Sequence, residues 1–515
     1  MIRFRSTNAR LWLGLCLAIV APRAYLAVSD QGMVWADEIF QTIEQAHRLA
    51  FGYGLVPWEF KQGARSWILA GILAALMKGL AFVGMKTGLG LAVGIKLLFA
   101  GLAAATFYPL VRMAQVLAGR LAAVLLAAMA AVFPAVLLYG SRAMTEVATA
   151  PLLAWGIWLL WRHGMGPGSK DAAALPLPTR ARWIGVRRVV LAGALFGLAT
   201  VLRYQNLVVL APIVFMVAIR ARWRAALGVV LAMAVVLLAG GLLDWATWGK
   251  PFQSLLVYVR FNLLEGGANQ WGVSERSFYW KTLWATSGPA FAVVLVGFVA
   301  GLRRTWQIAL PVLVFIVAHS AISHKELRFI YPVLPLFLLC SAVGLGLLLA
   351  KLPLSRAWRR AVTAALALLL LTTFGFRSLR VTFSDIGQVM PSPEIGGPTS
   401  RLVWGAFDER NRLLSVAGTH ADICGLAAPG INPYWTGGYT YFHRRLPIVW
   451  SEARPDLEAA NYVLVAPGHR MTDPRFRPVA QQGPYVLFRR DGTCGRASMP
   501  SASYGRLSPS GVVGP

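Results

Sequence analysis

The chain has 515 residues, of which 57% are hydrophobic and only 14% are charged. Repeated apolar runs near 20 residues exclude an ordinary soluble globular protein and predict an α-helical polytopic membrane protein. The formal net charge of +29 could indicate a nucleic-acid-binding protein. The basic residues instead cluster in short segments between the apolar runs, as in cytoplasmic loops of membrane proteins. We therefore expect a lipid bilayer, and no nucleic acid, as partner.

The chain starts with three arginines, Arg3, Arg5 and Arg10, followed by an apolar run at 11–28. This pattern could be a cleaved signal peptide. We favour an uncleaved first span, because the run is long enough to cross and the following segment looks functional. The basic start then predicts a cytoplasmic N-terminus, which places residues 29–65 on the outer face.

This first outer segment has a helical pattern. Its polar residues Asp37, Gln41, Glu44 and Arg48 fall on one helix face, and Ile39, Ile43, Ala46 and Ala50 fall on the other. The pattern predicts an amphipathic helix lying on the outer membrane surface. The sequence Gly52-Tyr53-Gly54 would end it.

Further apolar runs and basic segments predict the topology. The runs are 66–84, 91–111, 119–139, 144–161, 189–202, 205–219, 225–245, 287–302, 307–322, 330–350 and 361–378, and the basic segments are 112–120, 162–188, 220–224, 303–304 and 351–360. Because two cytoplasmic segments must be separated by an even number of spans, one run near the start has to lie flat or re-enter. We assign 66–84 to this interfacial role, which leaves about eleven spans.

The same parity places several distant segments on the outer face: 29–65, 140–143, 246–286, 323–329 and everything after 378. Arg203, at the tip between two short spans, also faces outward. Asp244 ends a span and is a further candidate, although a capping or structural role is equally consistent with its position.

Residues 379–495 differ in composition from the helical part at 1–378 and contain Arg but no Lys. Short apolar or alternating pieces at 445–450, 461–466 and 484–490 predict strands and hence a small outer-face α/β domain. Cys424 and Cys494 could form a disulfide, or they could be two free thiols. Cys16 and Cys340 lie in apolar spans as small buried residues. Residues 496–515, rich in Ser, Gly and Pro, are expected to be disordered.

Four ionisable residues interrupt the apolar sequence between the runs 307–322 and 330–350, at His324-Lys325-Glu326-Leu327-Arg328-Phe329. A juxtamembrane anchor would explain Lys325 and Arg328. It would not explain His324 and Glu326 between the same two spans. Ionisable clusters at such positions are functional by default, and this one suits an anionic phosphate.

The chemistry that fits is a transfer from a lipid carrier. An enzyme on the outer face has no access to nucleotide sugars, and the sequence has no P-loop, Asp-x-Asp pair or metal-ligand spacing, so we expect neither a metal nor a cofactor. A polyprenyl-phosphate sugar needs cations at the leaving phosphate, for which we assign His324, Lys325 and Arg328. It also needs a carboxylate to accept the proton of the acceptor hydroxyl, for which Asp37 or Glu38 is suited. A solvated helix face is the alternative for these two acids.

The hexapeptide resembles the His-Lys-Glu-x-Arg-Phe signature of the lipid-linked mannosyltransferases that build GPI anchors and N-glycans. The first outer loop is similar too, with Asp37-Glu38, Gln41, Glu44, Ala46-His47, Gly52-Tyr53-Gly54, Trp58-Glu59 and Arg65-Ser66. The resemblance implies a GT-C fold and an inverting transfer of mannose to a glycan or glycolipid hydroxyl. It implies Asp37 as base and Glu38 as its neighbour. Further site candidates are Glu44, His47, Arg65, Arg203, Asp244 and Glu326.

Two departures concern the substrate. Ala36 replaces the proline usual before Asp37, and Ala143-Met144-Thr145-Glu146 resembles other bacterial GT-C enzymes. Glucose or arabinose are therefore alternative sugars, and a lipid-glycan transporter or a non-catalytic scaffold are alternative classes. We expect a bacterial inner membrane with the site facing the periplasm, or, as the alternative, an endoplasmic reticulum membrane with a dolichol carrier.

Overall fold

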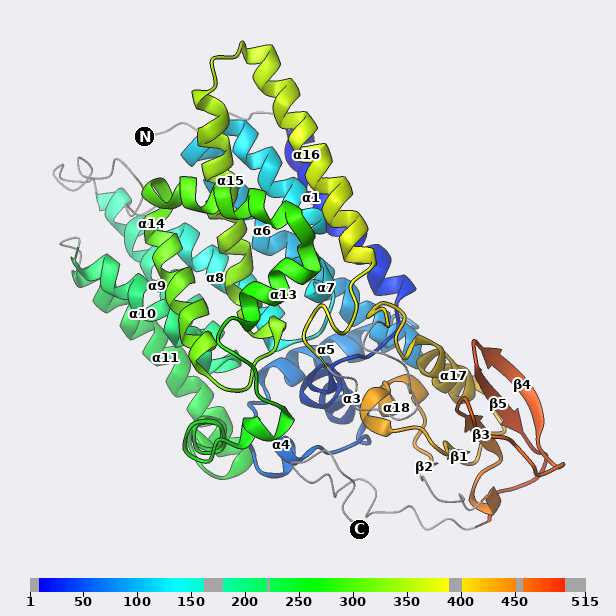
Figure 1. Ribbon diagram of the computed structural model, residues 1–515. Helices are drawn as coiled ribbons and strands as arrows, with labels where there is room; N and C mark the ends of the chain where they lie inside the picture. Colours follow the sequence, from blue (N-terminus) through cyan, green and yellow to red (C-terminus); the bar gives the residue numbers. More distant parts are fainter. Residues whose placement is uncertain (1–8, 162–178, 220–222, 389–400, 451–456, 496–515) are drawn as a thin grey trace.

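The computed structural model describes residues 9–161, 179–219, 223–388, 401–450 and 457–495. Most of them form a helical bundle (Figure 1). The turn between α15 and α16 lies at one end of it, and α3, α4 and α18 lie towards the other. The bundle helices are α1 (Ala9–Ser29), α5 (Ile68–Phe82), α6 (Gly88–Val132), α7 (Pro134–Tyr139), α8 (Thr145–Leu160), α9 (Thr179–Leu202), α10 (Leu207–Val217), α11 (Trp223–Trp248), α13 (Phe278–Ser287), α14 (Phe291–Ala321), α15 (Leu334–Lys351) and α16 (Arg356–Leu379).

Within the described ranges, six helical segments are long and apolar enough to cross a membrane, and four apolar helices are shorter. The predicted polytopic helical class is confirmed. The number of eleven spans stays a prediction, and so does the interfacial role of 66–84, which forms the 15-residue helix α5. A helix of that length is shorter than the about 20 residues that a simple span needs.

Two predicted boundaries appear as breaks inside continuous helices. Ala118 and Gly119 interrupt α6, and the positive φ of 84° at Gly119 suits a residue without Cβ. Thr305 interrupts α14 with a φ of −117°. The first break lies within the predicted basic segment 112–120, and the second directly follows the predicted basic segment 303–304. The predicted loops at these places are therefore kinks or tight turns.

The segment 36–51 is helical, with α2 (Ala36–Glu38), a π-helical turn (Ile39–Ile43) and α3 (Glu44–Phe51). The expectation of an open helix on the membrane surface is wrong. The apolar residues Ile39, Ile43, Ala46 and Ala50 of this segment are buried within the protein. Glu44 and His47 are also buried, because the C-terminal region covers them through α18 (Gly438–Phe442) and His443. After α3, the chain forms the short helix α4 (Trp58–Lys61).

The outer loop predicted at 246–286 includes the end of α11 and most of α13 and, between them, three helical turns. They are α12 (Gln253–Val259), a π-helical turn (Arg260–Leu264) and a 3₁₀ turn (Gly267–Trp271). The hexapeptide is extended at Glu326 and continues into a second 3₁₀ turn, Leu327–Val333, which leads directly into α15. Backbone with this irregular geometry lets several side chains of one short segment point in different directions.

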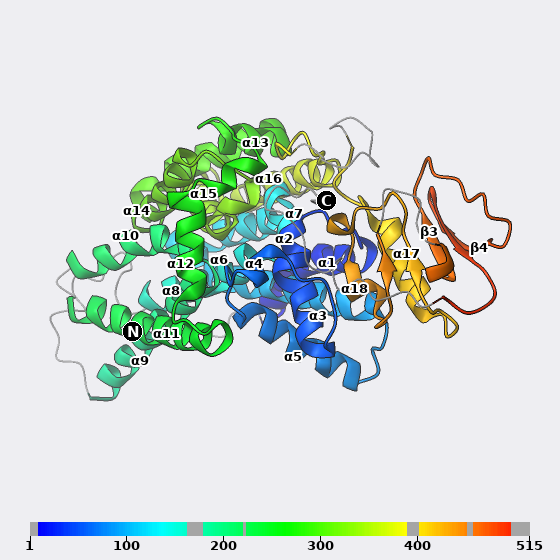
Figure 2. The same ribbon diagram turned by 90° about the horizontal axis from the view of Figure 1, so that it is seen from below.

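The C-terminal region forms a five-stranded mixed sheet of order β2-β1-β3-β5-β4. The strands are β1 (Leu426–Ala427), β2 (Ile448–Val449), β3 (Tyr462–Val465), β4 (Arg477–Gln482) and β5 (Tyr485–Arg489). β1 pairs in parallel with β2 and β3, and β5 pairs antiparallel with β3 and β4. Helix α17 (Asp408–Thr419) lies between this sheet and the bundle (Figure 2).

The three predicted strands are confirmed as β2, β3 and β5. The sequence missed β1, which has only two residues, and β4, whose residues Arg-Pro-Val-Ala-Gln-Gln are mostly exposed and lack an apolar alternation. Cys424 and Cys494 are joined by a disulfide. The expected disorder of 496–515 lies outside the described residues.

Candidate active site

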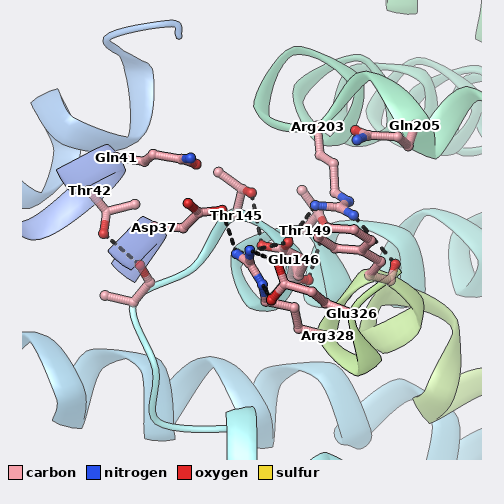
Figure 3. A network of polar contacts seen from close by, with 12 residues as sticks. Asp37, Gln41, Thr42, Thr145, Glu146, Thr149, Arg203, Gln205, Glu326 and Arg328 are labelled. Carbon is pink, nitrogen blue, oxygen red and sulfur yellow. Dashed lines mark hydrogen bonds and ion pairs between the residues drawn. The ribbon is translucent and has the colours of Figure 1, made fainter. Parts of the chain in front are cut away.

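Asp37 and Arg328 meet although they are far apart in the sequence. The Nη1 atom of Arg328 lies 2.6 Å from Oδ2 of Asp37. Asp37 is in the short helix α2, and its side chain is 30% exposed, whereas that of Arg328 is buried. Figure 3 shows the two side chains pointing toward one another. Of the two neighbouring acids, Asp37 is therefore the one that combines a cationic partner with access from outside.

Glu326 holds Arg328 in place. The Nε and Nη2 atoms of Arg328 donate hydrogen bonds of 2.8 and 2.7 Å to the two carboxylate oxygens of Glu326. Gln388 donates another to Oε2, and His324 lies 3.4 Å from Oε1. Although burial acts in the opposite sense, the charge of Arg328 and these bonds lower the pKa of Glu326. Glu326 is therefore an ionised anchor that fixes the guanidinium plane.

A second ion pair extends this network. Oε1 of Glu146, at the start of α8, lies 2.5 Å from Nη1 of Arg203 and 3.7 Å from Nη1 of Arg328. Arg203 also donates to the carbonyl of Phe329 at 3.5 Å. Two guanidinium groups thus alternate with the carboxylates of Asp37, Glu326 and Glu146 (Figure 3).

A pocket opens between the segment after Asp37 and the turn after α9. Two cations, Arg65 and Arg203, line it, and its other polar lining is neutral. The full lining is Gln41, Ala64, Arg65, Ser66, Leu69, Thr145, Val201, Leu202, Arg203, Tyr204, Gln205 and Tyr258. Gln41 and Thr145 adjoin the Asp37 and Glu146 segments, so the pocket borders the ion-pair network. Its cations and hydroxyl groups suit an anionic group.

Arg65 differs from Arg203 in its surroundings. Among the described residues, its side chain makes none of the ion pairs found in the structure, and only its carbonyl is bonded, by the Trp248 indole at 3.2 Å. The carboxylate of Glu59 is near enough for the charge of Arg65 to lower its pKa. Because this half-buried guanidinium forms no direct ion pair among the described residues, it is available to an anionic ligand.

Asp244 has a supporting position behind the same pocket. Its Oδ2 atom accepts hydrogen bonds from the backbone N and the hydroxyl of Ser254, at 2.9 and 2.6 Å. The Ser254 hydroxyl also lies 2.7 Å from the hydroxyl of Tyr204. Asp244 therefore fixes the start of α12 and, through Ser254, a tyrosine of the pocket wall, rather than contacting the ion-pair network directly.

Glu38 points into a separate buried cluster. It lies 3.5 Å from Nη1 of Arg142 and accepts a hydrogen bond of 3.4 Å from the backbone N of Ala143. Arg142 in turn pairs with Asp30 at 2.7 Å. Burial raises the pKa of Glu38. Of the two acids that the sequence offers as base, Asp37 faces Arg328 and Glu38 faces Arg142, and the assignment of the base to Asp37 stays a prediction.

Glu44 and His47 contact the C-terminal region instead of the Asp37 network. Both oxygens of Glu44 accept bonds from α18, including the backbone N and the hydroxyl of Thr440 at 3.0 and 2.7 Å. Nε2 of His47 lies 2.9 Å from Nδ1 of His443. Burial and the neighbouring His443 lower the pKa of His47 to about 3, so this imidazole is neutral. These two candidates join the segment 36–51 to the C-terminal region.

The hexapeptide is divided in its contacts. Arg328 pairs with both Asp37 and Glu326, whereas Nζ of Lys325 donates to the carbonyls of Ser274 and Ser323, at 2.7 and 3.4 Å. Nδ1 of His324 is 2.9 Å from the carbonyl of Gly272. Against the effect of burial, the bond and charge of Glu326 raise the pKa of His324. Two of the three cations that we assigned to phosphate thus contact the segment 272–274.

The sequence reasoning missed Glu146 and Glu59 as site residues. Glu59 accepts a hydrogen bond of 3.1 Å from Gln41, and burial together with the charge of Asp37 raises its pKa to about 7. Glu146 lies in the first turn of the apolar helix α8 and is its only acid. An ionisable residue in such a helix is a functional-site candidate, so the sequence could have indicated Glu146.

The fold has counterparts among solved structures. It matches ArnT from Cupriavidus metallidurans bound to undecaprenyl phosphate with a TM-score of 0.58 and 12% identity, covering 95% of this chain and 100% of that one. It also matches the archaeal oligosaccharyltransferase AglB from Archaeoglobus fulgidus with a TM-score of 0.53 and 12% identity, covering 88% and 69%. The chain therefore has the GT-C fold of membrane glycosyltransferases.

Residues 14–409 match the sequence model of the Alg9-like mannosyltransferase family, and the chain belongs to this family. It is 28% identical over 370 residues to GPI alpha-1,2-mannosyltransferase 3 of Danio rerio, covering 69% of this chain and 62% of that protein. It is 25% identical over 337 residues to GPI mannosyltransferase 3 of Yarrowia lipolytica, covering 63% and 61%. The matched part thus spans about three-fifths of the length of these relatives.

Proposed function

We propose that the protein is an inverting glycosyltransferase that moves mannose from a polyprenyl-phosphate carrier to a hydroxyl group of a glycan or glycolipid. The contact between Asp37 and Arg328, beside a pocket with two further arginines, carries this proposal. A carboxylate next to a phosphate-binding cation is the pair that such a transfer requires. Membership of a mannosyltransferase family supports mannose as the sugar.

In the proposed step, Asp37 accepts the proton of the acceptor hydroxyl while the oxygen of that hydroxyl forms a bond to C1 of mannose. The bond between C1 and the phosphate oxygen breaks on the opposite face, and the carrier leaves as polyprenyl phosphate with the electron pair. Attack from the face opposite the leaving group inverts C1. Negative charge grows on the phosphate during this step, and cations fixed beforehand stabilise it.

For the phosphate we propose Arg328 together with Arg65 and Arg203 of the pocket. Arg65 supports this assignment because its side chain forms no direct ion pair among the described residues, although its charge acts on nearby Glu59. His324 and Lys325 remain predicted phosphate ligands from the sequence, but their present contacts to the segment 272–274 favour a different role.

For the location we propose a bacterial inner membrane with the site facing the periplasm. The disulfide between Cys424 and Cys494 supports an oxidising compartment on the side of the C-terminal region. The curated relatives named above come from eukaryotes, which supports the endoplasmic reticulum as the alternative. The proposed carrier is accordingly undecaprenyl or decaprenyl phosphate, or dolichyl phosphate. The division into a catalytic part at 1–378 and a C-terminal domain at 379–495 is likewise a proposal.

The test uses the purified protein in detergent with radiolabelled polyprenyl-phosphate mannose and a lipid extract from the source cell. Transfer of label to an extractable glycolipid or glycan is the expected result. Transfer only from a glucose or arabinose donor would keep the mechanism and replace the sugar. No transfer from any lipid-linked donor would contradict the proposed glycosyltransferase activity and favour a transporter or a scaffold.

A further inference from the structure

Three aromatic rings form a cluster beside the hexapeptide. The ring centroids of Trp58 and Phe261 are 4.7 Å apart, and those of Phe261 and Trp271 are 5.6 Å apart. The planes of Trp58 and Trp271 are within 23° of parallel. Trp271 is 44% exposed, so the cluster is an accessible aromatic platform.

The backbone beneath the platform is built to present it. Gly266 and Gly272 have φ values of 60° and 105°, which suit residues without Cβ. A Cβ on Gly267 would lie only 2.4 Å from the Phe261 ring, so the backbone packs directly against that ring. A tight glycine-supported turn thus carries Trp271 outward.

The hexapeptide holds this turn in place. His324 and Lys325 contact the carbonyls of Gly272 and Ser274, and the backbone N of Ser274 donates to the carbonyl of Ser323 at 2.9 Å. The contacts follow Trp271 within three residues. They fix the position of its ring relative to Glu326 and Arg328.

The platform joins both halves of the candidate active site. Trp58 directly precedes Glu59, which is bonded to Gln41, one helical turn from Asp37. The Trp271 ring lies 6.3 Å from that of His324, which contacts Glu326. A molecule lying on the rings would therefore border His324, which contacts Glu326, and the Trp58-Glu59 segment, which is bonded to Gln41.

Sugar rings are the occupants that this chemistry suits. One face of a pyranose carries C–H groups, which stack on the electron-rich face of an aromatic ring, while the hydroxyl edges need polar partners. Asn269 and Gln270 are exposed next to Trp271, and Asn262 is half-buried near Phe261. A membrane-interface aromatic belt would account for the exposed tryptophan but not for the bonds of the hexapeptide to its turn.

We propose that Trp58, Phe261 and Trp271 form a stacking subsite for a pyranose ring of the acceptor, and that His324 and Lys325 are positioning residues that hold it. Only the assignment of the bound ring to the acceptor rests on the proposed function. Sugar binding at this subsite is tested without measuring transfer.

The first experiment is saturation-transfer NMR on the full chain in detergent with methyl α-D-mannopyranoside as probe. Trp271→Ala and Phe261→Ala are compared with Trp245→Ala, whose side chain is 60% exposed at the end of α11. We expect signals on the sugar ring protons for wild type and Trp245→Ala. The Trp271 and Phe261 variants should lose about three- to tenfold in affinity, as expected for one aromatic stack.

The outcomes separate this inference from the proposed enzyme. Loss of sugar signal in Trp271→Ala, but not in Trp245→Ala, supports the subsite even if mannose transfer fails. The subsite is overturned if wild type gives no sugar signal, or if Trp271→Ala and Trp245→Ala give equal sugar signals. Farnesyl phosphate methyl signals that depend on Trp271, with unaltered sugar signals, would assign the rings to the carrier chain and also overturn it.

The positioning role is tested by kinetics where transfer is measurable. Lys325→Met removes the bond to Ser274, and Lys325→Arg can restore a donor there. We expect Lys325→Met to raise the KM for acceptor several-fold and leave the KM for donor unchanged, with recovery in Lys325→Arg. A selective rise in the KM for donor would instead indicate that Lys325 binds the donor phosphate, and it would overturn the positioning role.

Discussion

Arg328 divides its guanidinium between two carboxylates: Nη1 faces Asp37 at 2.6 Å, and Nε and Nη2 face Glu326. Glu326 takes the two parallel donors that fix the plane of the group, and Asp37 meets the remaining edge. Asp37 is the most exposed of these three side chains. A substrate can therefore reach the carboxylate while its cationic partner stays fixed.

Asp37→Asn should abolish transfer and leave folding intact. The amide oxygen can still accept from Arg328, but an amide cannot take the proton of the acceptor hydroxyl. We expect kcat to fall by about 100-fold or more, measured with radiolabelled polyprenyl-phosphate mannose. Retention of more than about a tenth of wild-type kcat would exclude Asp37 as the base.

Glu38→Gln is the matched control for that variant. Glu38 lies one residue away but faces the buried Arg142. Removing its charge leaves Arg142 with fewer buried partners, so we expect a lower melting temperature and a kcat within a few-fold of wild type. The reverse pattern, with unchanged melting and lost kcat, would transfer the catalytic role to Glu38.

Arg328→Lys should impair catalysis although it preserves the charge. An ammonium group has no planar fork and cannot bond both oxygens of Glu326 while facing Asp37. We expect kcat to drop at least about tenfold, with a smaller change in melting temperature. Arg260→Lys, at an exposed surface pair with Glu265, serves as control and should behave as wild type. Wild-type kcat in Arg328→Lys would show that charge alone is required.

The sequence predicted the helical class and the strands because long apolar runs and short alternating pieces are local patterns. It also selected Asp37 and Arg328, since charged residues next to apolar runs are costly unless they are paired, hydrated or functional. It did not predict that Lys325 turns away from Arg328, because the direction of each side chain depends on an extended residue and a 3₁₀ turn. Nor could it predict that Glu44 is covered, because its partners lie almost 400 positions away, as the separation of 396 to Thr440 shows.

Glu59 should make stability depend on pH. Its folded pKa of about 7 lies above the reference value of 4.5, so the folded state binds the proton more tightly. Its favourable contribution is complete below about pH 4.5 and is lost as the pH rises to about 7. Glu59→Gln removes this dependence, so it should be more stable than wild type at pH 8, by up to about 3 kcal/mol, and similar at pH 4.5.

Thermal unfolding in detergent across pH 4.5 to 8 measures this difference between the two proteins. Glu275→Gln, an exposed residue paired with Lys281, controls for the general loss of one negative charge. A constant difference between Glu59→Gln and wild type over the whole range would contradict the raised pKa.

Glu44→Gln should loosen the C-terminal region. Both carboxylate oxygens of Glu44 accept two bonds each, from Leu55 and Tyr439 at Oε1 and from Thr440 at Oε2. Glutamine replaces one acceptor by an NH₂ donor, which would face donors. We expect a destabilisation of about 3 kcal/mol, whereas Thr440→Ala, which removes a single bond, should cost about 1–2 kcal/mol.

Limited proteolysis and thermal unfolding together test this role. Protease should cut between the bundle and the C-terminal sheet faster in Glu44→Gln than in wild type, because the bonds from α18 hold the two parts together. The exposed control Glu275→Gln should be cut at the wild-type rate. Unchanged cleavage and melting in Glu44→Gln would mean that the remaining packing around α17 and α18 suffices, and Glu44 would return to the list of candidate substrate ligands.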